Sequence, residues 1–372
     1  MLDSFGGAGS GSPVGSERSL SAPVPGCQNT RRRRSRVGSC EDAVVPSDAT
    51  PVSETDVLGE PYLAETLELP PDDEGEVVAT LVRRAAAGPT TKAVLHVHGF
   101  ADYFFQTEYA EWWTERGYDF YALDLRKYGR SLRPHQTPNY ITDLREYFPE
   151  LDEAWRRVAA RDEHPEVVLS AHSTGGLVVG LWADARRPAE LVGAVMNSPW
   201  LDLQGSAALR VLGTPVIKQL GRRQPMREIK RRVDGFYTRS LHREHEGEWD
   251  FDLLWKPIES FTVYAGWLRA IREGHARLHR GLAIAHPVLV LSSGRSTVPQ
   301  QMSEDVHGTD VVLDVAQIRR WATSYGPHVT YLAIEGARHD VVLSRTEPRQ
   351  AAYDAIAAWL TAWVDPPNPT LL

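Results

Sequence analysis

The first chemistry that the sequence offers is a serine at the end of an apolar run. Residues 167–171 are mostly apolar and indicate a buried strand, Ser173 follows them, and residues 177–182 indicate a helix. A serine hydroxyl becomes an effective nucleophile only when the chain holds it clear of the backbone and a base takes its proton. A sharp strand-to-helix turn would expose the Ser173 hydroxyl and direct the backbone N–H of Thr174 toward a developing oxyanion.

The residues that flank this turn are small, as a tight turn requires. Ala171 and Gly175 give the pattern A-x-S-x-G, where G-x-S-x-G is usual. The same pattern also arises by chance in ordinary glycine-containing turns. It therefore indicates a catalytic serine only together with a base and an acid elsewhere in the chain.

The last two predicted strands lead into such residues. The first is followed by a loop that contains Asp305, Asp310 and Asp314, and the second leads into His339. In an open parallel sheet, ligands bind beyond the carboxyl ends of the strands. The order serine, acid, histidine is typical of the α/β-hydrolase arrangement and differs from the order in other serine-triad folds.

A second oxyanion donor is expected at the end of the predicted strand 93–99. Gly99 allows the chain to turn back there, so that the backbone N–H of Phe100 can face the serine.

From about residue 91 to residue 363, the chain resembles the α/β-hydrolases of the monoacylglycerol lipase, lysophospholipase and serine aminopeptidase group. It departs from the usual pattern at Ala171, and at Lys127 and Tyr128, where the group has Gly-His. The acid also lies unusually far beyond its strand. The segments that carry the resemblance are His-Gly-Phe at 98–100, Asp-Leu-Arg-Lys-Tyr-Gly-Arg-Ser at 124–131, Tyr-Ile-Thr-Asp-Leu at 140–144, Gly-Thr-Asp-Val-Val at 308–312 and Gly-Ala-Arg-His at 336–339.

The resemblance implies a role for five residues. Ser173 would attack an acyl carbonyl, and His339 would take its proton and later protonate the leaving alcohol. Asp310 would orient the imidazole and stabilise its charged form. The backbone N–H groups of Phe100 and Thr174 would bind the oxyanion.

The choice of acid among three aspartates rests on local pattern. Asp310 is preferred because it follows a glycine and precedes an apolar pair, as in the family pattern, while Asp314 and Asp305 remain alternatives. Residues 300–307 are interpreted as an insertion before this acid.

Other histidines have simpler interpretations. We expect His172 to pack beside the turn and not to act as a second base. His96 and His98 share one face of a strand, which could indicate a metal site. No third ligand accompanies them in the sequence, so core histidines with satisfied hydrogen bonds are the preferred interpretation.

The scaffold that must position these residues follows from apolar periodicity. Alternating strands and helices predict a mostly parallel sheet with helices on both faces, that is, an α/β-hydrolase fold. The alternation stops after the sixth predicted strand, where short amphipathic segments indicate an inserted helical cap. The expected strands are 67–69, 77–82, 93–99, 120–124, 167–171, 193–197, 287–291 and 329–334, and the expected helices are 108–116, 144–160, 177–182 and 346–364.

Composition divides the chain into four parts. Residues 1–55 are rich in Gly, Ser, Pro and Arg and predict a disordered tail, because they hold too little apolar surface to fold. Residues 56–199 and 286–372 form the two parts of the predicted hydrolase core. Residues 200–285 form the predicted cap.

Bulk composition excludes several classes of protein. The 372 residues are 42% hydrophobic and 24% charged, as in ordinary globular proteins, and a formal charge of −8 argues against nucleic-acid binding. No apolar run approaches the roughly 20 residues of a membrane span. The only two cysteines, Cys27 and Cys40, lie in the tail, which excludes a disulfide-bonded core and suits a reducing, cytoplasmic location.

The leading functional hypothesis is a hydrolase of carboxylic esters that needs no cofactor or metal. Its expected partner is a small acyl ester, with at most peripheral membrane contact. An aminopeptidase-like amide hydrolase and a non-catalytic binding protein are the alternatives, and the oligomeric state is left open. Apolar cap residues suggest a lipid-like acyl group, although packing of the cap on the core explains them equally well; they are Leu209, Val211, Leu212, Val216, Ile217 and Leu220. Acidic cap residues could bind a free amine, but a solvated charged segment is the preferred interpretation; they are Glu246, Glu248, Asp250 and Asp252.

Overall fold

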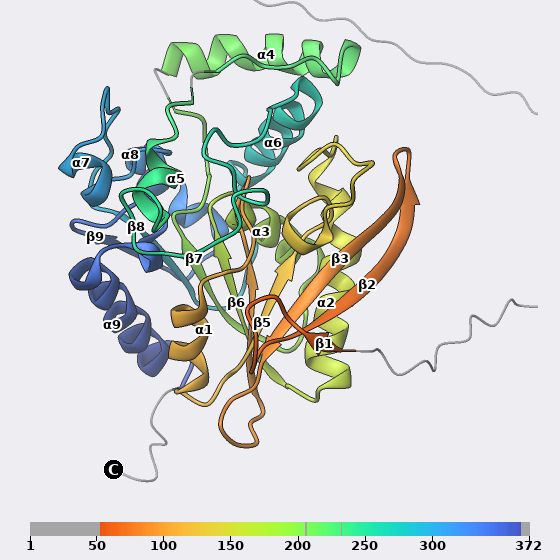
Figure 1. Ribbon diagram of the computed structural model, residues 1–372, viewed down its shortest axis with the longest axis vertical. Coiled ribbons are helices and arrows are strands. Elements are labelled where there is room, and N and C mark those ends of the chain that lie inside the picture. The colour runs from red at the N-terminus through yellow and green to blue at the C-terminus, as the bar shows by residue number, and fades with distance from the viewer. Residues whose placement is uncertain (1–52, 205–206, 232, 366–372) are drawn as a thin grey trace, which may run out of the picture. The chain divides into compact units, whose positions relative to one another are not determined.

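A nine-stranded sheet runs through the part of the chain that the computed structural model describes, residues 53–365 without 205, 206 and 232 (Figure 1). Its order is β1-β2-β3-β5-β4-β6-β7-β8-β9. The strands are β1 (Glu54–Thr55), β2 (Leu63–Asp72), β3 (Gly75–Arg84), β4 (Lys92–Val97), β5 (Asp119–Asp124), β6 (Glu166–His172), β7 (Leu191–Asn197), β8 (Val288–Ser293) and β9 (Val329–Ile334).

The sheet is mostly parallel, as predicted. Strands β1, β2, β3 and β5 pair antiparallel, and every pair from β5 through β4, β6, β7 and β8 to β9 is parallel. The central strands are buried on both faces, which explains their continuous apolar sequences. In β4, Val97 is level with Leu123 of β5 and Ala171 of β6. The loops that follow these strands therefore meet at one edge of the sheet.

Helices cover both faces of the sheet (Figure 1). Residues of α2 and α3 pack in one apolar cluster with the sheet, and residues of α1 and α9 pack in a second cluster on the other face. The helices are α1 (Thr107–Thr114), α2 (Phe148–Trp155), α3 (Thr174–Arg186), α4 (Ala207–Arg223), α5 (Phe236–Leu241), α6 (Ala265–Leu278), α7 (Glu304–Gly308), α8 (Val315–Trp321) and α9 (Thr346–Trp363).

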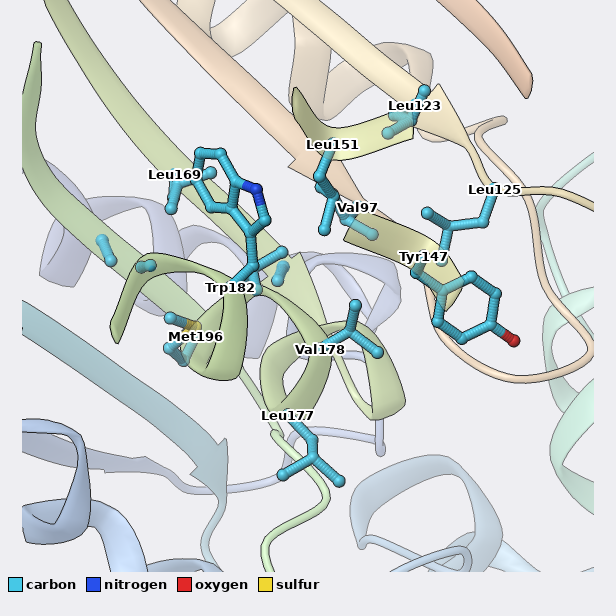
Figure 2. Packing of buried hydrophobic residues seen from close by; sticks show 14 of the residues in the cluster. Val97, Leu123, Leu125, Tyr147, Leu151, Leu169, Leu177, Val178, Trp182 and Met196 are labelled. Carbon is cyan, nitrogen blue, oxygen red and sulfur yellow. The ribbon is translucent and has the colours of Figure 1, made fainter. Parts of the chain in front are cut away.

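Helix α3, which begins directly after Ser173, is fixed by large apolar side chains. Figure 2 shows Trp182 of this helix beside Leu169 of β6, Val178 and Met196 belong to the same apolar cluster, and all four side chains are buried. Burying such side chains contributes about 1.5–3 kcal/mol each. The element that carries the serine is therefore rigidly attached to the sheet.

The predicted cap corresponds to the chain between the end of β7 and the start of β8. In the described part of this segment the regular elements are α4, α5 and α6, and the sheet receives no strand from it. Figure 1 shows α4 lying across α6. A Cβ on Gly221 of α4 would lie 2.5 Å from the carbonyl oxygen of Ala265 in α6, so the two helices are in close contact. The division into core and cap domains stays a prediction.

Three details differ from the sequence-based expectation. Strand β1 makes the insertion follow the seventh strand and not the sixth. The helix expected over 144–160 consists of a 3-10 turn (Leu144–Tyr147), α2 with a proline in its first turn, and a π-helical turn (Arg156–Arg161). The expected disordered tail lies outside the described residues, except that Glu54–Thr55 pairs with β2.

None of the helices in the described ranges combines the length and the apolar content that crossing a bilayer requires.

Candidate active site

The serine lies at the strained turn that the sequence predicts. Between β6 and α3, Ser173 has φ of 53° and ψ of −118°, a conformation that costs on the order of 1–3 kcal/mol. Its backbone N–H donates to the carbonyl of Asn197 at 2.9 Å, which ties the turn to β7. A Cβ on Gly175 would lie 2.4 Å from the carbonyl oxygen of His98, so only glycine allows this approach.

The structure brings the predicted base and acid to this serine. Ser173 Oγ lies 3.0 Å from Nε2 of His339, and Nδ1 of His339 lies 2.8 Å from Oδ2 of Asp310. The other oxygen of Asp310 accepts the backbone N–H groups of Val312 and Leu313 at 2.8 and 2.7 Å. All three of the interacting side chains are buried. A hydroxyl, an imidazole and an anchored carboxylate therefore form one hydrogen-bonded chain.

The loop after β8 explains how a distant acid reaches the histidine. The backbone of Asp310 pairs with this loop, donating to the carbonyl of Arg295 and accepting the N–H of Thr297, both at 3.0 Å. The insertion expected before the acid, residues 300–307, includes most of α7 and lies between these paired segments. The carboxylate of Asp310 thus returns to the end of β8.

The two alternative acids have other partners. Asp314 caps the N-terminus of α8 by accepting the backbone N–H of Ala316 at 3.0 Å. Asp305 forms an exposed ion pair with Arg295 at 2.6 Å.

The two expected oxyanion donors border the same space. Thr174 is the first residue of α3, where backbone N–H groups have no partner within the helix. Phe100 lies in the loop after β4, and this loop is pressed against the turn, because a Cβ on Gly99 would lie 3.0 Å from Cβ of Ser173. Phe100, Thr174, Ser173 and His339 all line one cavity.

His172 is more than the packing residue that we expected. Its ring centroid lies 4.9 Å from that of His339, and its Nδ1 lies 3.1 Å from Asp102 and 3.9 Å from Asp340. Burial alone would lower the pKa of His172, but these two carboxylates outweigh burial and raise it. Lys256 completes the group with an ion pair to Asp102 at 2.8 Å. A charged network therefore lies beside the serine.

The cavity at the serine has a volume of about 490 Å³, within the roughly 300–1,000 Å³ that is typical of small-molecule sites. Two cations, Lys256 and Arg231, line it together with one acid, Asp234, among the described residues. The remaining lining is largely apolar. It comes from the segment between β7 and β8 and from the loop that carries Asp310. It includes Trp200, Leu203, Ile229, Phe236, Ile258, Val263, Trp267, Leu268, Val311, Val312 and Leu313.

The apolar cap residues from which we predicted an acyl preference lie elsewhere. Val216 is exposed on α4, and neither it nor Ile217 or Leu220 is among the lining residues of the described chain. The side chains of Leu209, Val211 and Leu212 lie outside the described residues. The correction is that apolar residues outside α4, in the rest of the segment between β7 and β8, line the cavity, because α4 packs on α6 and away from the serine.

Sequence reasoning missed two of the lining residues that bear on chemistry. Trp267, whose ring centroid lies 4.3 Å from that of Phe100, belongs to the amphipathic helix α6, and that periodicity was the available signal. Lys256 had no local signal. Its partner Asp102 is distant in the sequence, so only the folded chain brings the two together.

His96 in β4 and His98 directly after it both lie in the core. His96 Nδ1 lies 3.0 Å from Ser170 Oγ, and both ring nitrogens of His98 have backbone partners. The described part of the chain contains no cluster of three or more potential metal ligands. Nε2 of His96 is buried without a hydrogen-bond partner, so the expected satisfied hydrogen bonds are present at His98 and only in part at His96.

Comparison with protein families agrees with this geometry. Residues 88–345, well over half of the chain, match the serine aminopeptidase (S33) family of hydrolases. The chain belongs to this family. The phospholipase YtpA of Bacillus subtilis is 32% identical to this S33 hydrolase over 112 residues. That alignment covers 30% of the chain and 41% of the phospholipase.

Solved structures share the fold. The monoglyceride lipase of Saccharomyces cerevisiae has a TM-score of 0.58 at 15% identity, covering 79% of the S33 hydrolase and 94% of the lipase. The monoacylglycerol lipase of Paleococcus ferrophilus has a TM-score of 0.57 at 21% identity, covering 76% and 98% of the two chains. At such low identities the likeness establishes the α/β-hydrolase fold alone.

Proposed function

We propose that this S33 hydrolase cleaves carboxylic esters with a lipid-like acyl group through an acyl-enzyme on Ser173. The observation that carries the proposal is the hydrogen-bonded chain from Ser173 through His339 to Asp310 at the wall of a largely apolar cavity. The names of the matched phospholipase and monoglyceride lipases support the same class of substrate.

The geometry supports a two-step mechanism. Ser173 Oγ attacks the ester carbonyl while His339 Nε2 takes its proton, and the backbone N–H groups of Phe100 and Thr174 bind the oxygen that becomes negative. The tetrahedral intermediate collapses when His339 returns the proton to the leaving alcohol. Water then attacks the acyl-enzyme by the same route and releases the acid. Asp310 stabilises the imidazolium in both steps.

The charges around the cavity favour esters over substrates with a free amine. A free amino group needs a carboxylate partner, yet the described lining holds a single carboxylate, Asp234, together with the cation Arg231 and the ammonium of Lys256, which already pairs with Asp102. Three of the four acidic cap residues that could have bound an amine have arginine partners: Glu246 pairs with Arg239, Asp250 with Arg243 and Glu248 with Arg349. The fourth, Asp252, accepts the backbone N–H of Leu254 at 2.7 Å.

The first test replaces the proposed nucleophile. Ser173→Ala should reduce hydrolysis of a p-nitrophenyl ester by roughly a million-fold, because a triad acts as a unit. A fluorophosphonate probe should label the wild-type protein at Ser173 and leave the variant unlabelled. Unchanged turnover in the variant would contradict the proposal, and a wild-type protein that is neither labelled nor active would favour a non-catalytic binding protein.

A panel of esters with graded acyl chains, measured beside aminoacyl amides, tests the substrate class. We expect activity on esters with medium or longer chains because of the apolar lining. Faster turnover of aminoacyl amides would favour the aminopeptidase alternative. The cytoplasmic location and the absence of more than peripheral membrane contact stay predictions from the sequence.

A further inference from the structure

A buried lysine from the insertion contacts the loop that carries an expected oxyanion donor. Lys256, in the segment between α5 and α6, is 3% exposed, and its ammonium lies 2.8 Å from Oδ1 of Asp102. The rings of Phe105, Tyr237 and Phe251 lie 5.8, 5.5 and 6.0 Å from the same nitrogen. Aromatic faces stabilise a cation that has lost its water. The lysine is therefore held in one place.

Asp102 connects this ammonium to the site. Its Oδ2 lies 3.1 Å from Nδ1 of His172 and 3.4 Å from the backbone nitrogen of Gly99. Gly99 directly precedes Phe100, whose N–H is an expected oxyanion donor. The carboxylate is 1% exposed, so water screens it little. Its charge therefore acts directly on the loop after β4 that carries Phe100, here called the oxyanion loop.

The sign of this charge matters for the reaction. Hydrolysis of an ester builds negative charge at the oxyanion, and a buried carboxylate nearby would oppose that charge. Burial alone would raise the pKa of Asp102, but Lys256 and His172 outweigh burial and hold it well below its usual range. The carboxylate thus stays ionised, and a cation beside it is needed to cancel its field.

We infer that Lys256 is a positioning residue of the reaction: its ammonium neutralises Asp102, so that the oxyanion loop keeps its geometry without an opposing negative charge. This inference rests on the proposed function. It assigns to the insertion an electrostatic part in catalysis, in addition to its part in lining the cavity.

The test separates the loss of the Lys256 charge from the loss of its packing. Lys256→Met should lower kcat for a p-nitrophenyl ester by roughly 10-fold or more and change KM by less than about threefold, because the loss affects the transition state. Lys256→Arg keeps the cation and should retain most of kcat. The double variant Lys256→Met with Asp102→Asn removes both charges and should recover most of the lost kcat.

Lys127→Met is the matched control. Lys127 is also a buried lysine with carboxylate partners, Asp72 at 2.7 Å and Glu74 at 2.5 Å, but it is not among the cavity-lining residues of the described chain. This variant should lower the melting temperature and leave kcat within about twofold. If Lys256→Met does not fold, Lys256→Gln tests the same loss of charge with a polar side chain.

The outcomes separate the two proposals. A labelled, active wild-type protein whose Lys256→Met and Lys256→Gln variants keep the wild-type kcat would overturn the inference alone. A double variant as slow as Lys256→Met would also overturn it, since the loss would then come from packing. A wild-type protein that hydrolyses no ester and is not labelled at Ser173 would overturn the proposed function, and the inference with it.

Discussion

At the scale of single residues, the two carboxylate oxygens of Asp310 have different partners. One accepts two backbone N–H groups of its own loop, and the other faces the imidazole of His339. Hydrogen bonds to an ionised acceptor are stronger than neutral ones and fix its orientation. The loop therefore holds the carboxylate where it selects one tautomer of the histidine.

This arrangement predicts different effects for two neighbouring aspartates. Asp310→Asn should lower kcat by roughly 10,000-fold, as expected when an amide stabilises the wrong tautomer of a triad histidine. Asp314→Asn is the matched control and should leave kcat unchanged, because asparagine caps a helix about as well as aspartate. Steady-state kinetics of both variants test the assignment. Loss of activity in Asp314→Asn with retention in Asp310→Asn would reverse it.

At the scale of elements, the turn between β6 and α3 depends on how closely α3 approaches the loop after β4. The first turn of α3 lies so near that loop that a side chain at Gly175 has no room. Ala171, by contrast, lies at the end of β6 and is fully buried without glycine's freedom. The motif's second small residue is therefore the one that the packing demands.

Gly175→Ala should lower the free energy of unfolding by about 1–3 kcal/mol or more, since its Cβ would overlap the carbonyl oxygens of Val97 and His98 at 2.6 and 2.4 Å. Gly213→Ala is the control within another helix. Nothing lies within 4 Å of a Cβ there, so alanine should stabilise α4 by up to about 1 kcal/mol. Urea unfolding of the two variants measures both effects, and equal stability would contradict the close approach.

At the scale of the whole molecule, buried neutral histidines link folding to pH. His96 is 2% exposed, and burial, the largest cause, lowers its pKa to about 3. The unfolded chain binds a proton at this residue below about pH 6.5, whereas the folded chain does so only near pH 3. The folded state is therefore fully favoured above pH 6.5 and loses stability as the pH falls from there toward 3.

Across that window, His96 should make the free energy of unfolding fall by about 1.4 kcal/mol for each unit by which the pH is lowered. His96→Asn should flatten the pH dependence of the free energy of unfolding by this amount. The exposed His135→Asn serves as the control and should leave the slope as it is. Urea unfolding between pH 4 and pH 7 makes the comparison, and parallel curves for His96→Asn and the wild type would contradict the prediction.

The sequence by itself determined the alternation of strands and helices and the places of Ser173 and His339. Apolar periodicity reports on local packing, and the small residues around the serine report on a local turn. The order of the nucleophile, the acids and the histidine along the chain then indicated one fold.

Only the tertiary structure decided which aspartate faces His339, which apolar residues line the cavity, and that Lys256 lies against Asp102. These facts depend on contacts between segments far apart in the chain. The acid is positioned by a loop that returns to β8. The cavity is lined in part by α6, whereas α4 packs on α6 and none of its described residues lines the cavity. Local sequence carries no record of such contacts, because side-chain partners across a fold are set by the geometry of the folded chain.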